Sequence, residues 1–299
     1  MAAALNLSST PFLRQIASTR TPKASMSVRA TSRPSESLST STSVGTKENE
    51  DRGLSSSSSS SFSPPPNFKP PEPKRFGVRP DKVLDVLGAS LSLIFRLGTG
   101  IFVDGYSVSL VPKNDFPPDK YALEIAGFKV KETSKLGPRP EKPIEIYEFE
   151  RYIACSVDPN TGVSMYESDD IIKYLVQNYG DGNVPLSLSL GLLTTLSEGF
   201  AMIGRPGRGS IYKPSKLPPA PLEIWAYEGS PFCKLVREVL VELELPHLVR
   251  CCARGSPKRQ QLYEKEGHFQ VPYLDDPNTG VRMFESAEIV EYLQATYAL

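Results

Sequence analysis

The residues best suited to thiol chemistry lie in the tetrapeptide Ser230-Pro231-Phe232-Cys233. Ser230 can cap a helix and Pro231 fits the first helical position, which puts Cys233 in the first turn. The N–H groups and the dipole at a helix start favour a thiolate. A serine hydroxyl does not ionise near neutral pH, so Ser230 cannot replace a redox thiol, although it can donate a hydrogen bond to one. Cys233 could form a mixed disulfide if it is exposed, whereas a buried Cys233 would be a small core residue.

A second candidate pair, Glu285-Ser286, precedes the last apolar segment of the chain. Ser286 can cap a final helix, and a helix N-terminus is a ready anion site. The two histidines, His247 and His268, have no cysteine partner at zinc-ligand spacing. We therefore expect no metal site.

The chain has four cysteines, which are too few for a disulfide scaffold. This number is typical of a protein in a reducing compartment. Besides Cys233 the cysteines are Cys155, Cys251 and Cys252. Because neighbouring residues of a strand point to opposite faces, at most one of the adjacent pair Cys251-Cys252 faces the core.

The elements that position these residues follow a mixed α/β order. Leu222–Tyr227 is rich in aromatic and branched residues, which predicts a strand, and apolar residues three or four apart then predict a helix from Pro231. The elements expected after it are a short strand at His247–Cys252, a polar helix at Pro257–Glu266, a Val271-Pro272 step, a hairpin, and a helix that starts at Ser286.

This order, with three motifs, resembles the thioredoxin superfamily, and within it the glutaredoxins and the amino-terminal domain of glutathione transferases. The motifs are SPFC (230–233), VPYL (271–274) and FES (284–286). The resemblance predicts an α/β, thioredoxin-like fold for residues 218–299. It implies a module that binds glutathione or another small thiol and acts as an oxidoreductase or a transferase.

The resemblance also implies roles for individual residues. Ser230 and Cys233 would lie at the thiol site, and a serine at the first of these positions donates to the thiolate of bound glutathione in some transferase classes. The backbone of Val271, before a cis Pro272, would pair with the cysteinyl part of glutathione. Glu285 and Ser286 would hold the γ-glutamyl group. Glutaredoxins usually have a cysteine where this chain has Ser230, so classical disulfide reduction is not expected.

An alternative remains open: a non-catalytic protein-interaction or membrane-associated module that retains only the fold. Ser230 and Ser286 would then be helix caps, and Cys233 would be buried and inert. The exposure and pKa of Cys233 discriminate between the two hypotheses.

The amino-terminal part of the chain is unlike the rest in composition. Lys+Arg and Asp+Glu balance at 34 each in the whole chain, without a basic block, which gives no electrostatic case for binding nucleic acid. Residues 1–30 contain no Asp or Glu but carry Arg14, Arg20, Lys23 and Arg29 among Ser, Thr and Ala. This composition is typical of an organelle transit peptide, and the MAAA start favours the plastid (chloroplast). Residues 31–79 are serine-rich and then proline-rich, which predicts a disordered linker.

Two strongly apolar stretches, Asp81–Phe102 and Val184–Gly204, interrupt the middle of the chain. Asp85 and Arg96 would be costly in lipid, so we predict for the first stretch an amphipathic helix that lies on the protein or peripherally on a membrane. We predict that the second is a helix packed between two folded units, with a membrane-surface anchor as its alternative.

A sequence repeat links the middle of the chain to its end. Residues 158–175, DPNTGVSMYESDDIIKYL, match residues 276–293 at 12 of 18 positions, and 143–150 resembles 221–228. The interval from Glu150 to Asp158 is about 40 residues shorter than that from Glu228 to Asp276. We therefore expect a truncated thioredoxin-like copy, in which RYIACSV (151–157) has no counterpart. Alternative splicing and an error in the gene model are the favoured explanations, and a real degenerate unit is the third.

These observations divide the chain into six parts. They are a transit peptide (1–30), a disordered Ser/Pro-rich linker (31–79), an apolar helix with a strand pair at Tyr106–Val111 and Leu123–Lys131 (80–140), a truncated thioredoxin-like repeat (141–182), an apolar helix and linker (183–217), and a glutaredoxin/glutathione S-transferase N-terminal-like domain (218–299).

Overall fold

The structure is a computed structural model that describes residues 62–74, 77–96, 98–149, 152–189, 196, 199–200 and 203–299. The expected transit peptide and the first part of the expected linker lie outside these residues.

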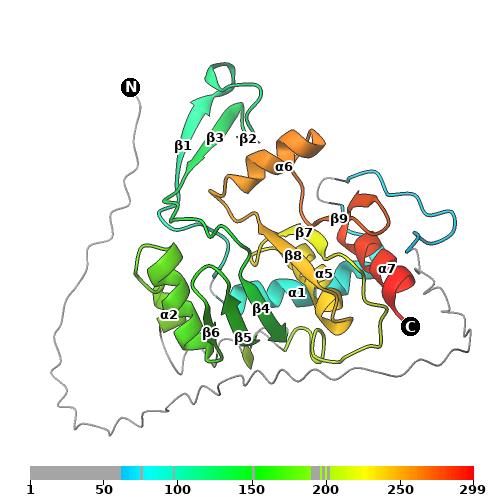
Figure 1. Ribbon diagram of the computed structural model, residues 1–299. Coiled ribbons are helices and arrows are strands. Elements are labelled where there is room, and N and C mark those ends of the chain that lie inside the picture. The colour runs from blue at the N-terminus through cyan, green and yellow to red at the C-terminus, as the bar shows by residue number, and fades with distance from the viewer. Residues whose placement is uncertain are drawn as a thin grey trace, which may run out of the picture. The chain divides into compact units, whose positions relative to one another are not determined.

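The C-terminal unit has the predicted thioredoxin-like α/β fold (Figure 1). Its elements are β7 (Leu222–Ala226), α5 (Pro231–Glu242), β8 (His247–Cys251), α6 (Lys258–Glu266), β9 (Tyr273–Asp276), β10 (Val281–Phe284) and α7 (Ser286–Tyr297). The sheet order is β10-β9-β7-β8, with β8 parallel to β7 and the other pairs antiparallel. The Val271-Pro272 peptide bond is cis, as the resemblance implied.

The core of this unit is built by one face of α5 against the sheet. Cys233, Val236 and Leu240 follow one another at helical spacing, and all three are fully buried. Ile224 of β7 is equally buried beneath them. The predicted cap is confirmed, because Ser230 is the N-cap of α5 and Pro231 its first residue.

A buried hydrogen-bond network ties α7 to the β9–β10 hairpin. The hydroxyls of Tyr292 and Tyr297 donate to Oδ2 of Asp276 at 2.5 and 2.6 Å. The backbone N–H of Asn278 donates to Oδ1 of the same carboxylate at 2.9 Å. Since both oxygens accept hydrogen bonds from within the fold, Asp276 is a structural carboxylate.

The same arrangement of strands recurs upstream, in a smaller sheet. It consists of β4 (Glu145–Phe149), β5 (Tyr152–Asp158) and β6 (Val163–Met165), in the order β4-β5-β6, followed by α2 (Ser168–Tyr179). Tyr174 and Tyr179 donate to Oδ2 of Asp158, each at 2.6 Å, as Tyr292 and Tyr297 do to Asp276.

The strand register corrects one expectation about this upstream sheet. Ser156 lies opposite Ile146 in β4, just as Leu274 lies opposite Ile224 in β7. The end of segment 151–157 therefore occupies the place of β9, although we predicted no counterpart for it. Backbone pairing defines the strand, so the side chains at these positions were free to differ. Ile146 is 45 % exposed whereas Ile224 is 0 % exposed, because α5 covers only the second.

The first apolar stretch forms a shorter helix than predicted. A 3-10 turn, η1 (Pro80–Lys82), leads into α1 (Val83–Phe95), which packs against α5. The positive φ angles of Gly98 and Gly100 end the helical path well before Phe102. In the described part of the chain no helix is long and apolar enough to cross a membrane.

The predicted strand pair is a three-stranded sheet. It comprises β1 (Ser107–Pro112), β2 (Leu123–Ile125) and β3 (Phe128–Thr133) in the order β1-β3-β2, with a 3-10 turn η2 (Lys113–Asp115) after β1. A two-residue turn at Ala126-Gly127, both at positive φ, splits the second predicted strand into a hairpin. Of the second apolar stretch only α3 (Leu186–Ser189) is described as an element, and most of the rest of it lies outside the described residues.

The last part of the predicted linker is packed on the C-terminal unit. We call residues 62–74 and 77–82 the N-terminal strap. Phe62 and Phe68 stack on Tyr297 and Tyr292, with ring centroids 5.2 and 5.0 Å apart. Residues 62–74 and 77–79, which we predicted to lie in a disordered linker, are thus packed on the C-terminal unit, because two aromatic side chains supply the apolar contact that the serine and proline run lacks.

Candidate functional site

The thiol predicted at the start of α5 is part of the core. Cys233 is 0 % exposed, and burial raises the pKa of its thiol to about 11, although hydrogen bonds from Ser230 and from the backbone at Tyr227 act in the opposite direction. A protonated thiol without solvent contact does not attack a disulfide or an electrophile. The structure therefore argues against the redox role predicted for Cys233.

Ser230 is occupied in capping the helix. Its Oγ accepts the backbone N–H of Cys233 at 3.3 Å, and the residue is only 4 % exposed. A chain segment from far upstream closes this position. A Cβ atom on Gly229 would lie 2.3 Å from Cγ1 of Ile101, so Ile101 is pressed directly onto the turn before Ser230. Ile101 is held there because its carbonyl accepts the N–H of Arg254 at 2.8 Å.

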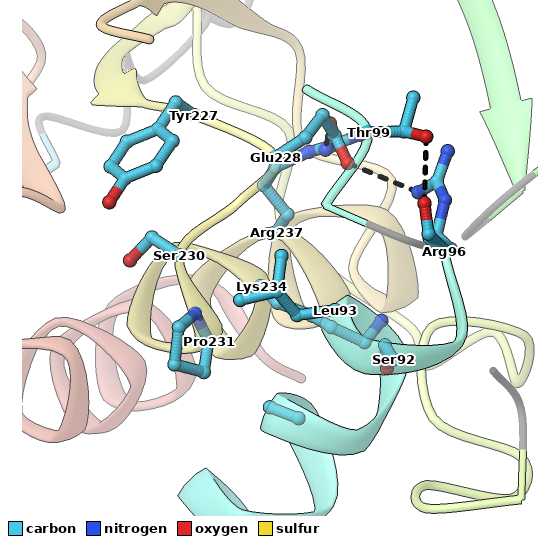
Figure 2. Close-up of a pocket in the computed structure, with 11 residues that line it drawn as sticks. Ser92, Leu93, Arg96, Thr99, Tyr227, Glu228, Ser230, Pro231, Lys234 and Arg237 are labelled. Atoms are coloured by element: carbon cyan, nitrogen blue, oxygen red, sulfur yellow. Dashed lines mark hydrogen bonds and ion pairs between the residues drawn. The ribbon is translucent and has the colours of Figure 1, made fainter. Parts of the chain in front are cut away.

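The space beside Ser230 is a cavity of only about 20 Å³ between α1 and α5 (Figure 2). Arg96, at the end of α1, pairs with Glu228 at 3.4 Å, and Arg237 of α5 pairs with the same carboxylate. A volume of this size admits about one water molecule. Ser230 therefore cannot receive the thiol of a tripeptide in this arrangement.

A larger cavity, of about 160 Å³, lies at the start of α7. Its lining residues are Phe232, Glu285, Ser286, Ala287 and Glu288 of the C-terminal unit, and Lys74, Gly77, Val78, Arg79, Pro80, Lys82 and Val86 from the strap and α1. Of the predicted residues, Glu285 and Ser286 thus line this cavity, Ser230 lines the smaller one, and Cys233 lines neither.

The carboxylate of Glu285 is the acidic group at this second cavity that accepts the most hydrogen bonds. Its Oε1 accepts the side-chain N–H of Gln270 at 2.8 Å and the backbone N–H of Lys74 at 2.5 Å. Glu285 has φ 74°, a left-handed conformation that is uncommon for a residue other than glycine. Backbone strain of this kind often accompanies a residue that must present its side chain at a fixed position.

Gln270 was missed by sequence reasoning. Its Oε1 is buried and has no hydrogen-bond partner among the described residues, while its Nε2 holds Glu285. An unpaired buried acceptor is uncommon and calls for an explanation, such as a donor that binds from outside. Its place directly before the Val271-Pro272 step was the signal that could have drawn attention to it.

Ser286 is the first residue of α7, and its side chain does not cap that helix. Its hydroxyl makes no hydrogen bond within the described part of the chain, although it lines the cavity. The first N–H groups of a helix lack intrahelical acceptors and favour an anion. A ligand carboxylate in this cavity could therefore accept hydrogen bonds from the Ser286 hydroxyl and from the first backbone N–H groups of α7.

Val271 and the adjacent cysteines Cys251 and Cys252 line neither of the two cavities. Val271 packs against the core beneath α5 and against a second buried cluster that contains Trp225 and Tyr273. Its backbone N–H and C=O form no hydrogen bond to any described backbone group. Cys252 is buried, with the pKa of its thiol raised by burial to about 12, whereas Cys251 is exposed. Within the described ranges no three His, Cys, Asp or Glu side chains gather as a metal site.

Comparison with known families gives one match. A family model described as "Glutathione S-transferase, N-terminal domain" matches residues 225–299, about a quarter of the chain. Comparisons with curated proteins and with solved structures give no significant match. The C-terminal unit is therefore a thioredoxin-superfamily domain similar to the N-terminal domain of glutathione S-transferases.

Proposed function

We propose that the C-terminal unit binds glutathione, or a related γ-glutamyl thiol, through the cavity at the start of α7, and that it does so without redox chemistry. The carrying observation is that a carboxylate and a helix start face the same cavity. The γ-glutamyl end of glutathione carries an ammonium and a carboxylate. Glu285 supplies the charge that binds the first, and Ser286 with the α7 start supplies donors for the second.

The size of the cavity indicates which part of the ligand it holds. While residues of the N-terminal strap line it, the cavity of about 160 Å³ suits an amino-acid-sized group rather than a whole tripeptide. The cysteinyl and glycyl parts would then extend past Val271, whose backbone groups are available. The thiol itself would have no partner at Ser230, because that residue is covered.

Calorimetric titration of the full chain with reduced glutathione tests this function. Glu285→Gln removes the charge at constant shape and should weaken binding at least about tenfold, since a hydrogen bond to a charged group is worth about 1.5–3 kcal/mol. The control is Glu264→Gln, at an exposed carboxylate of α6, which should leave binding unchanged. Equal affinities for the Glu285 and Glu264 variants would contradict the proposal.

The second candidate is a non-catalytic interaction module that retains only the fold. The burial of Ser230 and Cys233 favours it, because both residues then serve as cap and core. The same titration separates the candidates: no heat at millimolar glutathione, with the chain folded, would select the interaction module.

We also propose that the protein acts in plastids. Support comes from the acid-free, Ser- and Arg-bearing residues 1–30. A fusion of residues 1–79 to a fluorescent protein should be imported by isolated chloroplasts and shortened on import. Retention outside the organelle at full length would contradict this.

We propose, finally, that residues 141–182 are a truncated thioredoxin-like copy. The support is the shared strand register and the Asp158–tyrosine network, which repeats that of Asp276. A transcript that encodes about 40 more residues after Glu150 should then exist. Sequencing of complementary DNA across this region that finds only the short form would argue for a real degenerate unit.

A further inference from the structure

The proposed ligand cavity is closed on one side by the chain itself. Lys74, Val78 and Arg79 of the N-terminal strap line it opposite Glu285 and Ser286. These strap residues come from more than 200 positions upstream, and they are joined to α7 by side-chain and backbone contacts rather than by sequence proximity.

The contact between the strap and Glu285 is chemically specific. The backbone N–H of Lys74 donates to Oε1 of Glu285 at 2.5 Å. An N–H donor is also what the ammonium of a γ-glutamyl ligand would present to this carboxylate. Lys74 therefore occupies, together with Gln270, one of the two carboxylate oxygens that could accept a hydrogen bond from this ammonium.

Three anchors outside the carboxylate hold the strap in place. Arg79 pairs with Glu291 at 2.8 Å and with Glu288 at 3.5 Å on α7. Phe62 and Phe68 stack on two tyrosines of α7, Tyr297 and Tyr292. Phe62, Phe68 and Glu291 do not line the cavity, so they can be changed without altering the groups that would touch a ligand.

We propose that the N-terminal strap is an autoinhibitory element that competes with the γ-glutamyl ligand for Glu285. The inference rests on the proposed function of the cavity. In the closed state the backbone N–H of Lys74 holds Oε1 of Glu285, and binding of an ammonium at that oxygen requires the strap to move away from it. The apparent dissociation constant is then the intrinsic one divided by the fraction of molecules with an open strap.

The test uses the full chain with the strap loosened from outside the cavity. The variants are Phe62→Ala/Phe68→Ala, which removes the two stacked rings, and Glu291→Gln, which weakens the Arg79 anchor without touching an aromatic contact. Reduced glutathione is the probe, measured by calorimetry. Hydrogen–deuterium exchange of peptides that cover residues 69–82 reports strap release independently of the ligand.

The expected result is tighter binding by both variants. The double variant should bind glutathione about tenfold more tightly than the wild type. This follows if the fraction of molecules with a closed strap falls from about nine-tenths in the wild type to near zero in the variant. Glu291→Gln should bind glutathione about threefold more tightly. Glutathione added to the wild-type chain should also accelerate exchange in residues 69–82.

Two other results would overturn the inference in distinguishable ways. Faster exchange of the strap with unchanged glutathione affinity would show that the strap does not compete, while the proposed function stands. No glutathione binding by the wild type or by either variant, with the strap demonstrably released, would remove the proposed function and the competition together.

Discussion

The backbone N–H of Lys74 lies 2.5 Å from a carboxylate oxygen of Glu285, a residue 211 positions further along the chain. Glu285 itself has φ 74° and ψ 107° just before α7. A non-glycine residue in this conformation is strained, and glycine would adopt it at lower cost. The carboxylate is therefore held in place against a local backbone preference, which is consistent with a binding role.

The strain at Glu285 gives the first prediction. Both Glu285→Gly and Glu285→Ala remove the carboxylate, but only glycine relieves the positive φ. Glu285→Gly should therefore be more stable to urea than Glu285→Ala by about 1 kcal/mol. Both variants should lose glutathione binding alike. A glycine variant that is less stable than the alanine variant would show that the backbone at this position is not strained.

The buried thiol of Cys233 predicts a pH dependence of stability. The pKa of this thiol is raised from about 9 in the unfolded chain to about 11 in the fold. Above pH 9 the unfolded chain loses this proton and the folded chain keeps it, so stability present below pH 9 is lost as the pH rises towards 11. The loss should be on the order of 2–3 kcal/mol.

Substitutions of cysteine separate the contribution of the Cys233 thiol to this pH dependence from that of the tyrosines, which titrate in the same pH range. Cys233→Ala should be less stable than the wild type at pH 8, and the difference should shrink by pH 11, as followed by denaturant unfolding. Cys251→Ala, at the exposed thiol, should run parallel to the wild type throughout. If stability changed with pH in the same way in all three proteins, the thiol of Cys233 would have the same pKa in the folded and the unfolded chain.

The two aspartate networks provide a matched pair of substitutions. Asp276→Asn weakens the acceptor for the buried hydroxyls of Tyr292 and Tyr297, and should cost about 2–4 kcal/mol. Asp158→Asn makes the same change where the two tyrosines are only half-buried, and should cost less. Thermal unfolding monitored by circular dichroism compares them. A larger loss at Asp158 would contradict the burial assigned to the two networks.

A network of ion pairs joins α1 to α5, and it predicts the effect of a substitution at Arg205 on stability. Arg205 donates to Glu238 at 2.7 Å and to Asp85 of α1 at 2.7 Å, and Glu238 is almost fully buried. Arg205→Ala leaves Glu238 paired with Lys234 and should cost about 2–3 kcal/mol, below the usual 3–5 for breaking a buried pair. Arg208→Ala, three residues away and exposed, should change stability by less than about 0.5 kcal/mol. Equal losses of stability from the two substitutions would show that the ion-pair network does not stabilise the fold.

Local patterns predicted the C-terminal unit well. The serine cap, the proline at the first helical position and the apolar spacing of α5 all agree with the structure, because each depends on neighbours within a few residues. The same spacing also held a signal for the burial of Cys233, which shares a helical face with Val236 and Leu240.

The state of the candidate site could not be predicted in the same way. Ile101 covers Gly229, and Lys74 reaches Glu285, through contacts between segments more than 100 residues apart. A single sequence carries no periodic signal for such contacts. Residues 62–79 were predicted to be part of a disordered linker for this reason, since their serine and proline composition is that of a linker, whereas the partners of Phe62, Phe68 and Arg79 lie in the distant helix α7.

The binding of a γ-glutamyl group by Glu285 and Ser286 is tested most directly by separate calorimetric titrations of the full chain with glutathione and two analogues. Ophthalmic acid replaces the thiol of glutathione with a methyl group, and cysteinylglycine lacks the γ-glutamyl residue. If Glu285 and Ser286 hold the γ-glutamyl end and the thiol has no partner, ophthalmic acid should bind within about threefold of glutathione, and cysteinylglycine should give no heat. Loss of binding with ophthalmic acid, or binding of cysteinylglycine as tight as that of glutathione, would contradict the assignment of the cavity at α7.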